Sequence, residues 1–377
     1  MKKKWWISII LALALAVLVP LALRTTASAD TTAGDLYIGS AKIDPNGSLD
    51  SAGTWEFSPA SGNTPATLTL NNLTLSGTSY HGFKSSGENS GAYIYTTLPK
   101  LRIVVKGTCT LGDDSQIKYI NKSDSETTPV TYGIYSAGSS APTELTIEAA
   151  EGSNSKLIIK TADNPIRAKS LLVKSNISIE ATSGMRGIYL GAMQLNSGSN
   201  LSVTSGTSRF YSNALTCTTA LINSGATLTT VTKGCVYQEK DSTAFLGTTI
   251  QVNGTLNASC EGSTSENDGC QGRAISATTL QVGDGGKVYA KSLGTGKSGV
   301  ADGRNAIDVT TLTIAADGYL YAKTNNSAYS AVYAKNLNIS LPNNNVSCIT
   351  KPERPSVQDG NIYATDSQGS TTLATEV

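Results

Sequence analysis

The chain has 377 residues, of which 15% are charged and 6% aromatic, and its formal net charge is +1. This length is sufficient for a full hydrophobic core, and the polar, glycine-rich composition excludes a bundle of membrane-spanning helices. The single histidine, His81, excludes catalytic sites that need several imidazoles, such as a three-histidine zinc centre. No basic excess favours nucleic acid as a partner, and no phosphate-binding glycine loop or dinucleotide motif favours a nucleotide.

Residues 1–29 have the organisation of an export signal. Lysines at Lys2–Lys4 precede an apolar stretch, Trp5–Leu23, and the small residues Ala27–Ala29 follow it. We expect cleavage after Ala29, which removes four basic residues and no acid and leaves 29 − 4 = 25 basic against 28 acidic residues. The mature protein is then secreted or located at the cell surface. The alternative is an uncleaved anchor, since the stretch is long enough to span a bilayer, and this segment would be the protein's one contact with the membrane.

The most informative feature is a ten-residue pattern that occurs seven times. Each copy holds an alternating apolar pair, two more polar residues and a second alternating pair, and a short corner then leads to a third pair. The copy that begins at Asn305 illustrates this, with Ile307 and Val309, then Leu312 and Ile314, then Leu320 and Ala322. The copies start 22 (164 to 186) to 32 (273 to 305) residues apart, at Asn164, Arg186, Asn213, Thr243, Arg273, Asn305 and Ser330.

Alternation with a period of two predicts β-strands, and three short strands per repeat predict one turn of a parallel β-helix. A propeller blade would need about 40–50 residues per repeat. We therefore predict an all-β solenoid of about ten turns over residues 67–350, with a cap at each end. The N-terminal cap is expected at 30–66 and a C-terminal cap or tail at 351–377, because a solenoid leaves unpaired backbone at its ends.

Aligning the repeats predicts which residues stack. Leu201, Leu228, Leu256, Val288 and Leu320 are expected in one inner column, and Val203, Thr230, Ala258, Ala290 and Ala322 in the next. Two upstream segments fit less well: Tyr132–Tyr135 with Leu145–Ile147, which implies an inserted loop, and His81–Phe83 with Leu101–Ile103. Val346–Cys348 is expected to close the coil.

Several motifs carry a resemblance to a known group. Asp35–Gly39, Thr54–Phe57 and Thr67–Gly77, followed by Gly-Ile-Tyr and Leu-Thr-Ile repeats, resemble exported repeat proteins of Gram-positive bacteria over most of the mature chain. The resemblance implies a right-handed, single-stranded parallel β-helix. Related groups include carbohydrate-binding domains, some with calcium, and the architecture is similar to that of pectate-lyase-like enzymes. The acidic repeat of the calcium-binding relatives is mostly absent, and only two segments come near it, Asp268–Ile275 and Asp302–Ile307. No cofactor is therefore expected, and calcium stays open.

Six cysteines follow the export signal: Cys109, Cys217, Cys235, Cys260, Cys270 and Cys348. An exported chain can form disulfides, and Cys260 with Cys270 is the pair closest in sequence, but no bridge is assigned. The repeat places Cys217, Cys260 and Cys348 at core-facing positions, where buried free thiols are the alternative. No Cys-x-x-Cys spacing occurs, so no metal site is expected.

Cleavage of a glycan would need paired carboxylates, or calcium held by carboxylates beside a base. The outward position after the first apolar residue of each repeat holds one acid, Asp308, among Tyr135, Arg167, Tyr189, Thr216, Leu246, Ser276 and Tyr333. Asp113 and Asp114 are the one adjacent acid pair. No catalytic residue is assigned, and Asp113, Asp114 and Asp308 are the runner-up candidates. His81 is expected to be a turn residue.

Outward aromatic side chains are the sequence sign of a glycan site, because sugar rings stack on aromatic faces. Tyr289 and Tyr321 are expected on adjacent turns, with Tyr319 and Lys287 beside them. The alternative is that these tyrosines only stabilise the sheet exterior. The sequence thus favours a non-catalytic protein that binds polysaccharide or a host or cell-surface glycan, as an adhesin does. The alternatives are a polysaccharide lyase or glycoside hydrolase of the pectate-lyase-like type, on architecture alone, and a structural envelope protein.

Overall fold

The computed structural model of the protein describes residues 34–44, 48–49, 53–85, 88–117, 130–137, 142–206, 212–234, 241–261, 271–293, 305–324, 331–340, 356–358, 361–365 and 371–374. These residues are almost entirely β-structure in long parallel sheets, as predicted, and their helical part is one 3₁₀ turn, η1 (Asp114–Gln116). No helix in these ranges has the length and apolar character needed to cross a membrane. The export signal and Val346–Cys348 lie outside the described residues, as do Asp268–Cys270 and Asp302–Arg304 of the two near matches to the calcium repeat.

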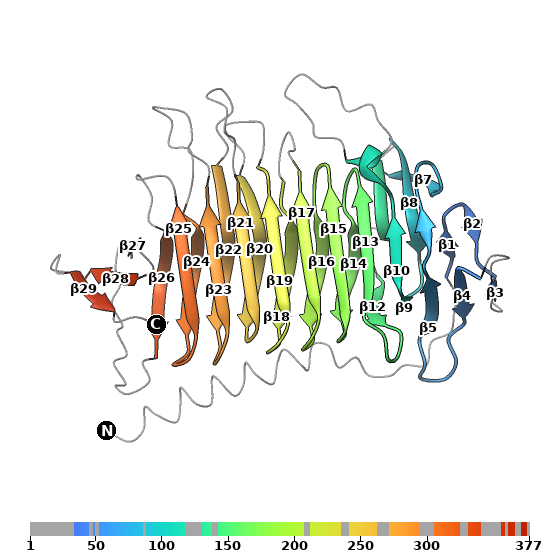
Figure 1. The fold of residues 1–377 in the computed structure, drawn as a ribbon. Coiled ribbons are helices and arrows are strands. Elements are labelled where there is room, and N and C mark those ends of the chain that lie inside the picture. The colour runs from blue at the N-terminus through green and yellow to red at the C-terminus, as the bar shows by residue number, and fades with distance from the viewer. Residues whose placement is uncertain are drawn as a thin grey trace.

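The strands of the repeats alternate between two sheets that run side by side along an elongated molecule (Figure 1). The first sheet holds the longer strand of each repeat: β14 (Ile166–Val173), β16 (Ile188–Leu195), β18 (Leu215–Ile222), β20 (Asp241–Val252), β22 (Gln271–Val282), β24 (Ile307–Ile314) and β26 (Val332–Ile339). The second sheet holds β6 (Thr74–Leu75), β10 (Thr108–Leu111), β13 (Ser155–Thr161), β15 (Ile177–Ser183), β17 (Asn200–Ser205), β19 (Thr227–Thr232), β21 (Thr255–Cys260), β23 (Lys287–Ser292) and β25 (Tyr319–Thr324). Neighbouring strands within each set are parallel, as the repeat requires.

The register between repeats is the predicted one. Leu201 pairs with Leu228, Leu228 with Leu256, Leu256 with Val288, and Val288 with Leu320. Both predicted inner columns are buried along their whole length. The outward column that runs from Tyr135 to Tyr333 is also paired at every step, which confirms the alignment of the repeats.

Each repeat contains three straight segments, but two of them belong to one strand. In β24 the buried residues are Ile307 and Val309, then Leu312 and Ile314, with two consecutive outward threonines, Thr310 and Thr311, between the pairs. Two outward residues in a row reverse the phase of the alternation, so the strand bends there. The three strands predicted per repeat are therefore present as one long bent strand and one short strand.

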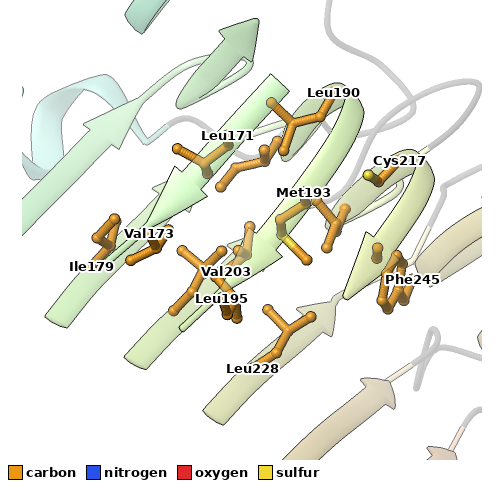
Figure 2. Packing of buried hydrophobic residues seen from close by; sticks show 14 of the residues in the cluster. Leu171, Val173, Ile179, Leu190, Met193, Leu195, Val203, Cys217, Leu228 and Phe245 are labelled. Carbon is orange, nitrogen blue, oxygen red and sulfur yellow. The ribbon is translucent and has the colours of Figure 1, made fainter. Parts of the chain in front are cut away.

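The side chains between the sheets form one continuous apolar core. Figure 2 shows part of it, where Leu171, Val173, Leu190, Met193 and Leu195 from neighbouring long strands pack against Ile179, Val203 and Leu228 of the short strands. Because each repeat adds the same inward positions, burial of apolar surface accumulates along the axis of the stack.

The position just before the first inward apolar residue of each repeat, which we call its entry position, holds only glycine, alanine or proline. Gly133, Pro165, Gly187, Ala214, Ala244, Ala274, Ala306 and Ala331 occupy this position, and all are buried. A Cβ added to Gly187 would lie 1.8 Å from the carbonyl oxygen of Ala214 in the next repeat, and one added to Gly133 would lie 2.3 Å from that of Pro165. Close approach of successive backbones at this corner therefore explains the small residue before the first isoleucine of the repeat.

The repeat is less regular toward the N-terminus. β11 (Val130–Ser136) pairs with the first half of β14, and β12 (Glu144–Ala149) pairs with the second half. β11 ends at Ser136 and β12 begins at Glu144, so the strand is divided where the sequence predicts an insertion. On their far sides β11 pairs with β8 (Glu88–Thr96) and β12 with β9 (Lys100–Lys106), so the same division continues into the preceding repeat.

The placement of His81–Phe83 in the preceding repeat was wrong. Ile94 of β8 pairs with Ile134, whereas His81 lies on β7 (His81–Ser85), which runs antiparallel to β8. Tyr93 and Ile94 belong to the continuous core, whereas Ala92 is buried in a second cluster with Tyr132 and Tyr135, against which Phe83 packs. His81 is accordingly a strand residue rather than a turn residue.

Antiparallel strands lie at both ends of the parallel stack. At the N-terminal end these are β1 (Leu36–Ile38), β2 (Ala41–Lys42), β3 (Ser48–Leu49) and β4 (Trp55–Ser58), and at the C-terminal end β27 (Ser356–Gln358), β28 (Asn361–Thr365) and β29 (Thr371–Ala374). β4 is antiparallel to β5 (Ala66–Asn71), whereas β5 is parallel to β9. β5 thus has one antiparallel and one parallel partner, and antiparallel pairing recurs farther along the chain, where β8 pairs with β7 and β1.

A cavity in an inner column should weaken the stack. Leu228→Ala removes a fully buried side chain between Leu201 and Leu256, and we expect a loss of about 2–5 kcal/mol in the free energy of unfolding. The neighbouring outward change Thr229→Ala should cost less than about 1 kcal/mol. Chemical denaturation of both variants measures the difference, and equal costs would contradict the assignment of inner and outer columns.

Candidate functional site

The four predicted binding residues lie together on the outer face of β23 and β25. Tyr289 and Tyr321 are register partners, so their backbones are about 4.8 Å apart, and Lys287 is the partner of Tyr319. The ring centroids of Tyr289 and Tyr319 are 5.4 Å apart at an interplanar angle of 46°. All three tyrosines are half-buried and Lys287 is exposed. The sequence therefore identified a real cluster, which we call the tyrosine face.

Strand alternation explains why these side chains point outward. Val288 and Ala290 of β23, and Leu320 and Ala322 of β25, are buried in the core. The residues between and beside them must then lie on the opposite side of the sheet. The three tyrosines are half-buried there, so part of each ring remains accessible for stacking against a sugar ring.

Two further lysines belong to this face, and the sequence analysis did not single them out. Lys291 and Lys323 follow Tyr289 and Tyr321 by two residues, are register partners of each other, and are both exposed. The alternation that placed the tyrosines also places these lysines outward. Neither aromatic stacking nor carboxylate pairing, the two patterns that predict a glycan site from sequence, involves a lysine, so they were missed.

A second aromatic cluster lies on the first sheet near the N-terminal end. Tyr37 stacks on His81 with ring centroids 3.7 Å apart, and Phe83 lies 4.6 Å from Tyr135. The rings of Tyr95 and Tyr135 are nearly parallel, at 19° and 6.0 Å. Because these rings face one another, the cluster chiefly fastens β1 and β7 to the parallel strands.

Arg167 and Tyr189 follow Tyr135 in the outward column that runs to Tyr333, and they lead away from the aromatic cluster. The Nη1 of Arg167 donates a hydrogen bond of 2.6 Å to the hydroxyl of Tyr135, and its guanidinium lies 5.1 Å from that ring's centroid. Tyr189 is the next residue of the column and is 51% exposed, which makes it the one exposed large apolar side chain in the described part of the chain. The predicted alignment of Tyr135, Tyr189 and Tyr333 is confirmed by register, with several repeats between Tyr189 and Tyr333.

His81 serves packing in this cluster. Burial lowers the pKa of its imidazole, and the charge of Asp35 acts in the opposite direction. The neutral ring stacked on Tyr37 and 4.8 Å from Tyr95 is therefore the form that predominates at neutral pH.

The three runner-up catalytic acids have structural partners. Asp113 caps η1, where its carboxylate accepts hydrogen bonds from the backbone N–H groups of Ser115, at 2.9 Å, and Gly77, at 2.8 Å. The side-chain and backbone hydrogen bonds of Ser115 and the Gly77 N–H together hold the pKa of Asp113 below its ordinary value. Asp114 pairs with Lys160 at 2.8 Å, and Asp308 pairs with Arg273 at 2.8 Å.

Asp308 is also too far from Asp113 and Asp114 to act together with either of them. Asp113 follows β10, and Asp308 lies in the strand that comes after β23. In the second sheet, β10 and β23 are six strand-to-strand steps apart. At about 4.8 Å per step this is roughly 30 Å, whereas the paired carboxylates of glycosidases lie about 5–10 Å apart. Asp113, Asp114 and Asp308 therefore do not form one catalytic site.

A charged hollow of about 300 Å³ lies where β9, β12 and the corners after β14 and β16 meet. It is lined by Arg102, Val104, Glu148, Ala149, Glu151, Lys174, Ser175 and Asn196. The nearly buried carboxylate of Glu148 accepts from Arg102 Nε at 2.6 Å and pairs with Lys174 at 2.6 Å. Sequence alignment missed this group because its three charged members come from successive irregular repeats.

Opposing effects act on Glu148. Burial raises its pKa, but the hydrogen bonds and charges of Lys174 and Arg102 outweigh burial and place the pKa below the ordinary value of 4.5. The carboxylate is thus ionised at neutral pH and holds the two cations in place. The arrangement joins three repeats by charge rather than presenting a proton donor.

Cysteines and possible metal ligands add no reactive centre among the described residues. Cys109 and Cys217 are buried free thiols, and burial raises the pKa of Cys217 to about 12. The side chain of Cys260 is buried in the predicted core-facing position, and Cys235, Cys270 and Cys348 lie outside the described residues. Within the described ranges no three His, Cys, Asp or Glu side chains gather as they would around a metal ion.

No family model, curated protein or solved structure matches this chain.

Removal of the Glu148 carboxylate should lower stability and reduce its acid dependence. Because its pKa is lower in the folded protein, ionised Glu148 stabilises the fold above about pH 4.5, and that contribution is lost as the pH falls through the folded-state pKa. We expect Glu148→Gln to cost about 1–3 kcal/mol at pH 7 and to show a smaller decrease in stability between about pH 5 and pH 3 than the unmodified protein.

Glu180→Gln is the matched control for this experiment. It breaks an exposed ion pair with Lys156, 2.7 Å long, on the second sheet, and should cost less than about 1 kcal/mol. Denaturation curves at several pH values measure both variants. Equal effects of the two changes would contradict the assigned role of Glu148.

Proposed function

We propose that this protein is an exported, right-handed, single-stranded parallel β-helix that binds a polysaccharide or a host or cell-surface glycan without cleaving it. The coil is a rigid support, and the ligand is held on its outer surface. The proposal includes removal of residues 1–29 and location outside the cell or at its surface. It agrees with the resemblance of the motifs to exported repeat proteins of Gram-positive bacteria.

The observation that carries the proposal is the tyrosine face. Tyr289 and Tyr321 are outward register partners, with Tyr319 beside them, so three rings lie within two adjacent strands of a regular sheet. The phenol hydroxyls add hydrogen-bond donors and acceptors at the edges of the rings. Flat rings held on a rigid sheet lose little side-chain freedom on binding, which favours stacking against sugar rings.

The alternatives have less support. A polysaccharide lyase or glycoside hydrolase would need carboxylates that act together, and the candidate acids are engaged in caps and ion pairs about 30 Å apart. A purely structural envelope protein would not need a ligand, so its outward tyrosines would serve stability alone. Retention on a glycan distinguishes this alternative from the proposal.

The test is retention of residues 30–377 on insoluble cellulose, pectin, chitin and peptidoglycan, with or without calcium, together with an assay for released sugar. We expect retention without product on at least one of these materials. Tyr289→Ala with Tyr321→Ala should reduce retention by about tenfold or more, since loss of each stacked ring costs roughly 0.5–1.5 kcal/mol beyond the area it buries.

Ser202→Ala is the control for the tyrosine variants, because it lies in the same outward column three repeats earlier. It should leave retention unchanged. If retention survives loss of the tyrosines but is abolished by Tyr189→Ala, the binding face is the other sheet. Release of product from any of the four materials would overturn the non-catalytic assignment.

The export signal is tested separately. We expect the protein recovered outside the producing cell to begin at Asp30, as measured by N-terminal sequencing or intact mass. Replacement of both Ala27 and Ala29 by large residues should block this cleavage and leave the protein in the membrane fraction. Recovery of a membrane-bound protein that still contains Lys2–Lys4 without these replacements would establish the uncleaved anchor instead.

A further inference from the structure

Lys291 and Lys323 form a like-charge pair on the tyrosine face. They are register partners in adjacent parallel strands, so their backbones lie about 4.8 Å apart. Like charges directly opposite each other across two strands destabilise a sheet. A pair of this kind therefore needs a reason beyond the stability of the fold.

Several outward lysines elsewhere on the sheets are paired with acids, whereas Lys106 of β9 and Lys335 of β26 are exposed, form no ion pair with a described residue and have no lysine as register partner. Lys156 lies 2.7 Å from Glu180, Lys160 lies 2.8 Å from Asp114, and Lys169 lies 2.7 Å from Glu144. In the described part of the chain, neither Lys291 nor Lys323 nor Lys287 takes part in an ion pair. The tyrosine face thus carries three uncompensated positive charges.

Among the described residues, no acid of the surroundings pairs with these lysines. The outward residues of β21, the preceding strand, are Thr255, Asn257 and Ser259, which are uncharged. The acids of the adjoining corners are Glu261, Asp284 and Asp317, which are exposed and form no ion pair with these lysines. The face therefore combines aromatic rings with a local positive potential.

The positions of the lysines match the rings. Lys287 precedes Tyr289 by two residues and Lys291 follows it by two, so the three side chains lie in one outward line about 13 Å long. A sugar ring over Tyr289 would have an ammonium group within reach on either side, and one over Tyr321 would have that of Lys323 on one side. Carboxylate or sulfate groups carried by the sugar would supply the missing opposite charge.

We propose that the tyrosine face takes an anionic polysaccharide, one whose sugar units carry carboxylate or sulfate groups. This inference rests on the proposed function and specifies its ligand class. The rings stack on the sugar, and Lys287, Lys291 and Lys323 pair with its negative groups. The stability lost to the like-charge pair is recovered when the ligand is bound.

The test compares two polymers with the same backbone. Polygalacturonate carries a carboxylate on each unit, and fully methyl-esterified polygalacturonate does not. We expect binding of the purified protein to the acidic polymer to be stronger and to weaken as salt is added, because exposed charge pairs are screened. Dextran sulfate, set against dextran, distinguishes sulfate from carboxylate as the preferred group.

The variant is Lys291→Gln with Lys323→Gln. We expect affinity for the acidic polymer to fall between about 2-fold and about 30-fold, with affinity for the esterified polymer unchanged. The matched control is Lys106→Gln with Lys335→Gln, two exposed lysines outside this face that form no ion pair and whose loss changes the net charge equally. The control should not weaken binding to the acidic polymer beyond a general charge effect of less than twofold.

Stability provides an independent readout. Because the Lys291–Lys323 variant removes a repulsion, it should unfold at the same denaturant concentration as the unmodified protein, or at a higher one. Lower stability would indicate a structural role for the lysines and would overturn the inference.

The outcomes separate this inference from the proposed function. Equal binding of acidic and neutral polymers, or equal effects of the two lysine double variants, would overturn the anionic ligand class while glycan binding stands. Absence of binding to any polysaccharide tested would overturn both.

Discussion

Register between successive repeats is the constraint on which the rest of the structure depends. A strand has side chains on both faces with a period of two, so a shift by one residue would move Leu256 outward and Asn257 into the core. The same shift would misplace every later repeat, since each strand is aligned on its predecessor. The continuous inner columns thus fix not only the core but also which residues can appear on the surface.

This constraint accounts for how much the sequence could predict. Ten residues per repeat carry the alternation, the small entry residue and the bend, so the columns from Ile166 onward followed directly from alignment. The prediction failed at His81, because a hairpin strand with the sequence His-Gly-Phe matches the repeat locally while Gly91–Thr96 occupies the repeat's place. The hollow at Glu148 and the aromatic cluster around Tyr95 were also unpredictable, since their members come from segments whose spacing the repeat does not set.

The candidate site was predictable because it lies in regular repeats. Tyr289, Tyr319 and Tyr321 lie in strands whose inward residues are unambiguous, so their outward direction needed no knowledge of the loops. Distances between acids, by contrast, became clear only from the number of strands between them. The sequence allowed Asp113 and Asp308 to be considered together, and six intervening steps of sheet separate them.

The two ends of the molecule use their outer surfaces differently. Near the N-terminus, charges and rings are satisfied within the protein, as in the pairing of Glu148 with Arg102 and Lys174 and the stacking of Tyr37 on His81. Such contacts hold irregular strands and a cap for which the repeat supplies no alignment. In β23 and β25 the repeat alone supplies the stability, so the outer positions need not contribute to it. This freedom permits the uncompensated Lys291 and Lys323 beside half-buried tyrosines, an arrangement that lowers stability slightly and leaves both charge and ring surface available to a ligand.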